Sequence, residues 1–465
     1  MSDSYGYLPI LYALGMVFWL VMGWILAGKQ LRRNFFDPIV LFCLSFAFFF
    51  FGSPAYALLT ENHWHIVHYQ QYPIEVPLEC FFWFMAFGFV TIGTYRVLGG
   101  HRLFAKNRET LLNFQVWETL TPKALKILII ILLIPALFAL GVQVKLILDN
   151  GIQGYLTHRT LLQAGGQIFI APLNLFAGVL LIYFVNQLVR SQVSEEKVNG
   201  PLLISLMLTA IFAGAVQGSR SRTLLSVLLL ILTLAILQGK KMSAKQVAMV
   251  LTPGILIVFA AAIVLQQVRF VLVKGQDLGQ SVEADAFVGN AVESLREYEN
   301  CWWLVYHQGE FETAKGLTFL AAVTTYVPRS IWLEKPYGGG PFIRNLIRPG
   351  TYNPNSGLPL TSYTTGLPAE GFMNFGHVGF LLAGVIYGFM LTGIAYALKF
   401  ARSTIPFCIW IGLLYRGVDF QRSEFLGGVA NTVFFCVPLL VAYYITKALS
   451  STSMESGVGT LANEG

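Results

Sequence analysis

One polar stretch, residues 318–376, holds most of the side chains in this chain that could carry out chemistry. Its cations suit an anionic ligand, because a guanidinium group can hold two phosphate oxygens at once. A glycine run at residues 338–340 would let backbone amides approach that ligand closely. The cations are Arg329, Lys335, Arg344 and Arg348, and the stretch also contains Glu370, four residues before Asn374. The alternative interpretation is an interfacial loop whose arginines reach lipid headgroups.

A second basic feature is the joint at residues 218–222, which reads Gly-Ser-Arg-Ser-Arg. Glycine and serine keep this turn compact, and the amides and dipole at the start of the following helix favour a negative charge. A diphosphate bound by Arg220 and Arg222 fits that description. Contact with lipid phosphates is the alternative.

The run at residues 149–162 supplies a third candidate, with His158 and Arg159. A histidine can transfer protons near neutral pH, although at a membrane edge it is more typical of solvated or headgroup contacts. Arg159 becomes relevant only as a partner of Arg220 around one anion. A last charged cluster predicts salt bridges among its own members, Arg416, Asp419, Arg422 and Glu424.

The composition indicates a membrane protein. The chain has 465 residues, of which 55% are hydrophobic and 12% charged, and its mean hydropathy is +0.62. So few charges cannot cover a soluble protein of this length. The net charge of +7 agrees with an excess of Lys and Arg in cytoplasmic loops. No basic, aromatic-interleaved soluble module is present, so nucleic acid is not an expected partner.

Hydropathy predicts an all-α polytopic fold with about 11 transmembrane helices, within a range of about 10 to 12. We expect a single integral membrane domain over residues 1–465. The first span is expected to be retained, because no Lys or Arg precedes it and no small-residue cleavage site follows. The predicted spans are at about residues 7–27, 36–59, 80–98, 124–146, 169–189, 201–216, 223–238, 247–268, 378–398, 405–417 and 427–448.

Basic residues predict the orientation of these spans. Lys and Arg gather in alternate joints, which are therefore expected on the cytoplasmic side. The N-terminus then lies outside, the tail at residues 449–465 lies inside, and residues 269–376 form a large outside loop. Arg220 and Arg222 also fall outside, where positive charge is normally avoided, so topology does not explain them.

The five cysteines show no metal-ligand spacing, so neither a metal site nor a cofactor is predicted. Cys43, Cys408 and Cys436 lie in apolar segments, where cysteine packs as a small hydrophobe. Cys80 and Cys301 fall in or beside outside regions, and their spacing leaves open whether they pair.

The order of these features resembles the Wzy-type oligosaccharide repeat unit polymerases of O-antigen, common-antigen and exopolysaccharide synthesis. The resemblance runs from about the fourth span to the end and rests on the Gly-Ser-Arg turn, the large outside loop, and the runs VPRSIWLEKP at 327–336, LPLTSYTT at 358–365 and PAEGFMNFGHVG at 368–379. The N-terminal third is similar only in hydropathy. The chain departs from the arginine-repeat pattern of some members, since no glycine lies eleven residues after Arg159.

The resemblance implies a glycosyltransferase with GT-C architecture at the periplasmic face of a bacterial inner membrane. Such an enzyme transfers an oligosaccharide from undecaprenyl diphosphate to the non-reducing end of a second lipid-linked repeat unit. A lipid-linked donor also follows from the residues, because no cytosolic domain and no DxD motif exist to hold a nucleotide sugar. The implied partners are lipid-linked oligosaccharides, membrane lipid and a Wzz-like co-polymerase that regulates chain length.

This chemistry assigns roles to the candidate residues. Fixed guanidinium groups can stabilise the leaving diphosphate without a metal, and Arg220 and then Arg329 are the first candidates, ahead of Arg344, Arg159 and Arg222. Glu370 is the expected general base, with a structural cap as its alternative role. The remaining candidates are His377 and His158 as rival bases, Asn374 and Lys335 as glycan or diphosphate contacts, and Trp332 and Tyr337 as sugar platforms.

Three other functions remain open at this point. An O-antigen ligase of the WaaL type shares the architecture and the donor but uses lipid A core as acceptor. A glycolipid flippase or exporter would show internal repeats and charges buried in mid-span, neither of which is clear in the sequence. A non-catalytic scaffold leaves Arg220 unexplained.

Overall fold

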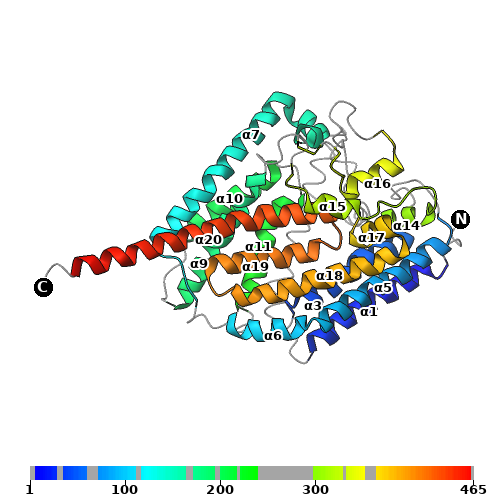
Figure 1. Ribbon diagram of the computed structural model, residues 1–465, viewed down its shortest axis with the longest axis horizontal. Coiled ribbons are helices and arrows are strands. Elements are labelled where there is room, and N and C mark those ends of the chain that lie inside the picture. The colour runs from blue at the N-terminus through cyan, green and yellow to red at the C-terminus, as the bar shows by residue number, and fades with distance from the viewer. Residues whose placement is uncertain are drawn as a thin grey trace. The chain divides into compact units, whose positions relative to one another are not determined.

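The computed structural model describes residues 6–28, 35–59, 72–111, 117–163, 171–193, 199–216, 220–238, 297–327, 331–332, 334–350 and 363–461. Apart from one isolated bridge between Glu118 and Ser403, every regular element in these ranges is a helix (Figure 1). Seven of the described helices are long and apolar enough to cross a membrane. The prediction of an all-α polytopic membrane protein is therefore confirmed.

Most of the predicted spans fall on helices of the structure. The seven long apolar helices are Leu8–Ala27, Pro38–Leu59, Glu75–Val97, Pro122–Gly151, Pro172–Val193, His377–Phe400 and Phe425–Ala448. Three shorter helices occupy the positions of the spans expected at 201–216, 223–238 and 405–417. The span expected at 247–268 lies outside the described residues.

The chain divides into two compact units, of which the first comprises Met1–Lys106, Gln276–Tyr396 and Leu414–Asn431. Its core is aromatic: Trp19, Phe46 and Phe51 are fully buried, and the rings of Trp19 and Phe46 meet edge to face, 5.1 Å apart at 83°. Such pairs add to the free energy gained from burying the rings. The helices of this unit are α1 (Leu8–Ala27), α3 (Pro38–Phe46), the π-helical η2 (Ala47–Gly52), α4 (Ser53–Leu59), α5 (Glu75–Val97), α14 (Glu297–Tyr306), α15 (Leu317–Val323), α16 (Gly339–Ile347), α17 (Leu367–Phe375) and α18 (His377–Ala397).

The loop expected over residues 269–376 is partly helical in the first unit, where it contributes α14, α15, α16 and α17. Cys80 and Cys301, the two cysteines whose pairing the sequence leaves open, are free and buried. α17 ends before α18 begins, because the backbone of Gly376 between them has a positive φ of 61°. Glycine adopts this angle easily, whereas residues with a side chain rarely do. The chain therefore turns sharply between Glu370 and the next membrane span.

One end of α3 is held by a buried acid. Asp37 caps the helix by accepting a hydrogen bond from the Ile39 amide (3.2 Å). Its carboxylate also accepts one from the Tyr95 hydroxyl (2.5 Å) and pairs with His101 Nδ1 (2.7 Å). His101 lies on α6 (Gly100–Leu111), an amphipathic helix directly after α5. These contacts join α3, α5 and α6.

The second unit comprises Asn107–Gly275, Ala397–Leu413 and Thr432–Gly465. Its polar anchor is the buried Asn186, which accepts from the Leu120 amide (2.8 Å) and from the Thr404 hydroxyl (3.2 Å). Two helices, α19 (Thr404–Asp419) and α20 (Phe425–Leu461), contribute to both units. The other helices of this unit are α7 (Pro122–Gln163), α9 (Leu175–Val193), α10 (Gly200–Val216) and α11 (Arg220–Gln238).

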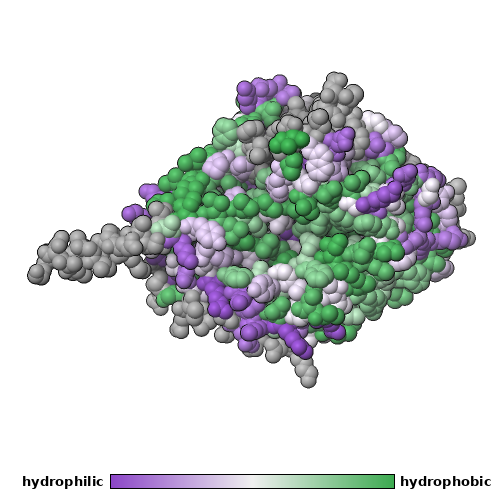
Figure 2. All heavy atoms as spheres, in the orientation of Figure 1, coloured by the Kyte–Doolittle hydropathy of each residue, from purple (hydrophilic) through white to green (hydrophobic). Residues whose placement is uncertain are grey.

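Large apolar side chains remain exposed on helices of both units, as a lipid environment permits. Figure 2 shows hydrophobic residues spread over the helices of the visible face. The exposed set includes Ile10, Leu14 and Trp24 of α1, Phe82 and Phe89 of α5, and Ile134, Leu137 and Phe138 of α7. A water-soluble surface does not carry so many contiguous large apolar groups.

Candidate active site

α17 is the centre of the site in the first unit. Residues from Leu367 to Asn374 are all buried, including Glu370 and Asn374. The Asn374 amide donates to the Glu370 backbone carbonyl (2.7 Å), one helical turn earlier on α17. The same amide donates to Thr318 Oγ1 (2.7 Å) and accepts from the Gly316 amide (2.9 Å). Asn374 thus ties α17 to the start of α15.

The Glu370 carboxyl is fully buried and only half satisfied. Its Oε2 accepts hydrogen bonds from the Phe425 amide (2.7 Å) and the Thr365 hydroxyl (3.5 Å). Among the described residues none donates to its Oε1 with hydrogen-bond geometry, although the Thr318 hydroxyl is near enough to favour the charged form of the carboxyl. The pKa of Glu370 is raised to about 7, chiefly because burial penalises the charged carboxylate. The Phe425 amide opposes this shift and the charge of Glu424 adds to it. The group therefore exchanges a proton near neutral pH.

The glycine run packs directly on this carboxyl. A Cβ at Gly339 would lie 2.8 Å from Glu370 Cδ, so only glycine fits there without displacing the acid. The Gly340 amide donates to Glu424 Oε2 (2.7 Å). Burial also raises the pKa of Glu424 to about 7, and the hydrogen bond from Gly340 opposes that shift. The run expected to hold a ligand instead lies against two buried acids.

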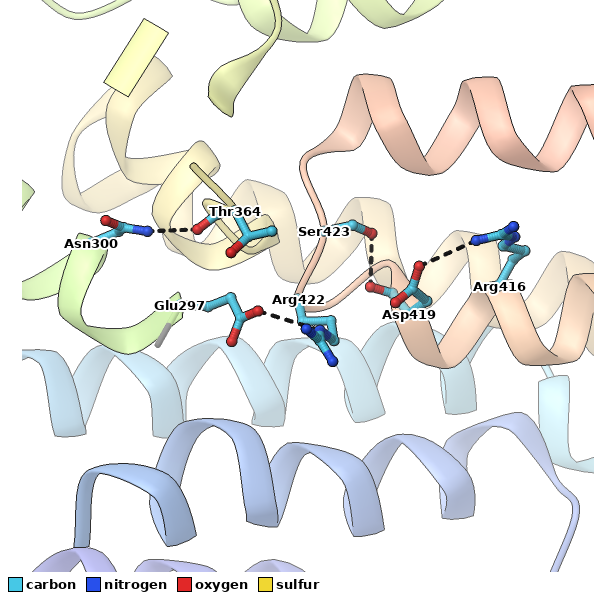
Figure 3. Close-up of polar contacts among 7 residues, drawn as sticks. All are labelled: Glu297, Asn300, Thr364, Arg416, Asp419, Arg422 and Ser423. Carbon is cyan, nitrogen blue, oxygen red and sulfur yellow. Dashed lines mark hydrogen bonds and ion pairs between the residues drawn. The ribbon is translucent and has the colours of Figure 1, made fainter. Parts of the chain in front are cut away.

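Two ion pairs involve residues of the segment just before Glu424, and Figure 3 shows both. Arg422 Nε is 3.3 Å from Glu297 Oε1, which joins the segment before α20 to the start of α14. Arg416 pairs with Asp419 of the same helix (3.5 Å), as the sequence predicts. Burial raises the pKa of Glu297, and the positive charge of Arg422 opposes that shift. The prediction of mutual salt bridges thus holds for one pair, whereas Arg422 has a partner from a distant segment.

Several buried side-chain oxygen atoms of the first unit receive no hydrogen bond from the described residues. Besides Glu370 Oε1, they are Glu297 Oε2, Asn300 Oδ1 and Gln421 Oε1. The Asn300 amide nitrogen is used, since it donates to the Thr364 carbonyl (2.6 Å; Figure 3). These four atoms are acceptors, and an unsatisfied buried polar atom costs about 1–3 kcal/mol. A buried donor on α14, Trp302 Nε1, likewise has no hydrogen bond within the described part of the chain. The four oxygens are chemically complementary to a group that donates hydrogen bonds.

A single short segment, residues 364–367, contacts all four of these side chains or their backbones. Its first two residues bond to Asn300 and Glu370, as given above. A Cβ added at its glycine would lie 3.1 Å from the Gln421 carbonyl and 3.3 Å from Glu297 Cβ. Because four extended residues span at most about 14 Å, the four acceptors belong to one compact region.

The other predicted residues of the outside loop have structural contacts. Lys335 is buried, and its Nζ donates to the carbonyls of Thr325 (2.9 Å) and Val327 (3.0 Å). The Arg344 guanidinium lies 5.0 Å from the centre of the Tyr363 ring, a cation–π contact. Lys335 therefore braces the loop instead of presenting its charge to solvent.

Two aromatic candidates and one cation are accessible. Trp332 and Tyr337 are half-buried, and Arg348 is exposed at the end of α16. Each of these side chains therefore keeps some exposed surface that a ligand can reach.

His377, the rival base, has a carboxylate partner of its own. Its Nε2 lies 2.6 Å from Glu79 Oε1, and its ring stacks on Trp83 at 5.1 Å and 22°. The Trp83 indole donates to the same Glu79 oxygen (3.3 Å). Both members of the pair are partly exposed. These contacts place His377 in a second polar site that joins α5 to α18.

The remaining predicted residues fall where side chains are not described. Arg329 lies outside the described residues, as do the side chains of His158, Arg159, Arg220 and Arg222. α11 begins at Arg220, so the first arginine of this run starts a helix. α7 extends to Gln163, so His158 and Arg159 are helical where a joint is expected, and Gly151 within this helix has a positive φ of 68°.

Sequence reasoning missed Glu297, Asn300 and Gln421. The spacing of the first two could have indicated them, because polar residues three positions apart on a helix lie on the same side of it. Gln421 gave no such indication, since a lone glutamine between charged residues is typical of a solvated turn. Comparisons of this chain with known protein families, with curated proteins and with solved structures found no match.

Proposed function

We propose that this protein is a lipid-linked oligosaccharide repeat unit polymerase, a glycosyltransferase of the bacterial inner membrane. In this proposal the chain has about 11 spans in a GT-C arrangement, a periplasmic N-terminus and a cytoplasmic C-terminus. The donor and the acceptor are both undecaprenyl-diphosphate-linked glycans, and a Wzz-like co-polymerase sets the product length. The large loop, which carries Glu370, then lies on the periplasmic side, where such glycans are available.

The observation that carries the proposal is the half-satisfied Glu370 carboxyl among unsatisfied acceptors. A general base needs a pKa near the working pH and a free oxygen aimed at the reacting group. Glu370 has a pKa raised to about 7 by burial, and its Oε1 accepts no hydrogen bond from the described residues. A sugar carries many hydroxyl groups that can donate hydrogen bonds. The buried side-chain oxygens of Glu297, Asn300 and Gln421 receive no such bond from the described residues. Perturbed carboxyls of this kind concentrate at functional sites.

The proposed step balances without a metal or cofactor. The acceptor hydroxyl gives its proton to Glu370 Oε1 while its oxygen bonds to the anomeric carbon of the donor. The bond from that carbon to the diphosphate breaks, and undecaprenyl diphosphate leaves with the electron pair. Arg220 and Arg329, supported by Arg159 and Arg222, are proposed to stabilise the charge on this leaving group.

One observation favours a second class, a proton-coupled glycolipid exporter. Carboxyls that exchange protons near neutral pH and buried ion pairs such as Glu297–Arg422 also occur in transport pathways. In this chain, however, Glu297 begins α14 and Arg422 precedes α20, so the pair lies at helix ends and outside the candidate spans. The polymerase is therefore the better-supported function.

The experiment is reconstitution of the purified protein in nanodiscs with a synthetic undecaprenyl-diphosphate repeat unit. A nanodisc holds no ion gradient that could drive export. An exporter also forms no glycosidic bond, so it would leave the repeat unit unchanged. We expect a ladder of longer glycans on a gel, and we expect the Glu370→Gln protein to leave the single repeat unit unchanged. Transfer to lipid A core without a ladder would identify a ligase instead, and no transfer to either acceptor would contradict the proposal.

A further inference from the structure

Glu370 and Glu424 each accept a hydrogen bond from a backbone amide at the start of another helix. Glu370, on α17, accepts from the amide of Phe425, the first residue of α20 (2.7 Å). Glu424, which precedes α20, accepts from the amide of Gly340 in the first turn of α16 (2.7 Å). Each carboxylate thus satisfies an amide at a helix start that would otherwise lack a partner. The two bonds tie α17, α20 and α16 together.

The glycine run lies between the two acids. A Cβ at Gly338 would lie 3.1 Å from Glu424 Oε2, and one at Gly339 would lie 2.8 Å from Glu370 Cδ. The bond from Gly340 to Glu424 therefore fixes the backbone that covers the Glu370 carboxyl. Loss of that bond would let α16 move away from Glu370.

Few groups act on the Glu370 carboxyl in the described part of the chain. The hydroxyls of Thr318 on α15 and of Thr365 in the preceding segment and the Phe425 amide favour its charged form. The negative charge of Glu424 favours the protonated form of Glu370. Because the two carboxyls lie against adjacent glycines, Gly338 and Gly339, they are expected to titrate as a coupled pair.

We propose that Glu424 is the positioning residue for Glu370, because it accepts the Gly340 amide and so fastens the glycine run over the Glu370 carboxyl. The negative charge of Glu424 also favours the protonated form of Glu370 and so influences the pH range in which Glu370 accepts a proton. This inference rests on the proposed role of Glu370 as the general base. Glu424 contacts neither sugar in this arrangement and acts only through Glu370 and α16.

Two variants separate the two parts of this role. Glu424→Gln keeps an oxygen that can accept from the Gly340 amide but removes the negative charge. The glycine run should stay in place, so the plateau rate of glycan transfer is retained. The acid limb of the pH–rate profile should move to lower pH, on the order of one pH unit, because Glu370 ionises more readily without the neighbouring charge. Glu424→Ala loses the hydrogen bond as well and should lower the plateau.

The matched control is Glu334→Gln, which removes a charge from an exposed glutamate shortly before α16. This variant should leave both the plateau and the acid limb unchanged. If Glu424→Ala fails to fold, Glu424→Gln still tests the charge. An acid limb that stays in place in Glu424→Gln would overturn the inference.

A second measurement does not depend on activity. Infrared titration of the substrate-free protein follows the protonated carboxyl band, and subtraction of the Glu370→Gln spectrum assigns the band of Glu370. In Glu424→Gln this band should disappear at lower pH than in the parent protein. A shifted band in a protein without polymerase activity would support the coupling and reject the proposed function, whereas an unshifted band would reject the coupling itself.

Discussion

Two buried carboxylates of the first unit, Asp37 and Glu370, have opposite surroundings. Asp37 receives the Ile39 amide and the Tyr95 hydroxyl and pairs with His101, so both of its oxygens have partners. Among the described residues, Glu370 has hydrogen-bond partners on Oε2 only, and the charge of Glu424 favours its protonated form. A buried charge with complete hydrogen bonding stabilises a fold, whereas an incomplete one costs free energy. The contrast fits a structural role for Asp37 and the catalytic role proposed for Glu370.

The largest expected effect is the loss of glycan transfer in Glu370→Gln. Glutamine keeps the shape and can still accept from the Phe425 amide, but it cannot take the acceptor proton. We expect the transfer rate to fall by roughly 10²- to 10⁴-fold, measured from gel ladders with equal amounts of folded protein. Glu312→Gln, at an exposed glutamate of the same loop, is the control and should keep the parental rate. Parental ladders from Glu370→Gln would remove this residue from the mechanism.

The matching change at the structural acid should act on stability alone. Asp37→Asn weakens the hydrogen bond from Tyr95 and the ion pair with His101, and hydrogen bonds to charged groups are worth about 1.5–3 kcal/mol each. We expect a lower melting temperature in detergent and an unchanged transfer rate per folded molecule. If Asp37→Asn melts normally but transfers slowly, satisfied hydrogen bonding does not distinguish structural acids from functional ones in this protein.

The alkaline stability of Glu370→Gln sharpens the comparison further. A carboxyl whose pKa is raised on folding, as that of Glu370 is to about 7, contributes stability that is present at low pH and lost as the pH rises through that value. The glutamine variant carries no such proton and should therefore melt at the same or a higher temperature than the parent at pH 8, even though it is inactive. A variant that melts well below the parent at pH 8 would indicate that Glu370 serves mainly as a helix cap.

The comparison also shows what the sequence could predict. The apolar spans were predictable because membrane-spanning length and composition are local properties, as α1 and α5 illustrate. The relation of Glu370 to Asn374 followed from helical spacing. The pairing of Glu297 with Arg422 did not, because the two residues lie 125 positions apart and nothing local links a helix start to a distant turn. Likewise, the glycine run predicted a close approach, but only the fold shows that the approaching groups are Glu370 and Glu424.

Crowding at the glycine run should give an intermediate effect. Gly339→Ala places a methyl group 2.8 Å from Glu370 Cδ, so the carboxyl or α16 must shift. Overpacking of this kind costs about 1–3 kcal/mol, and we expect a lower transfer rate together with a modest loss of stability. Gly393→Ala on α18, where an added Cβ meets nothing within 4 Å, should change neither quantity. Equal behaviour of the two alanine variants would show that Glu370 tolerates displacement.

The smallest expected effect concerns pH and the structural acid. The hydrogen bond to Asp37 raises the pKa of His101 above its usual value, and burial opposes that shift. A group with a raised folded-state pKa contributes stability that is fully present below its unfolded pKa of about 6.5. That stability is lost as the pH rises through the folded-state value.

The melting temperature of the parent should therefore fall more steeply between pH 6 and pH 8 than that of His101→Gln. Because His101 is partly exposed, solvent screens the pair and the difference between the two curves should be small. Identical curves would show that the ion pair with His101 adds nothing to the two hydrogen bonds that Asp37 already receives.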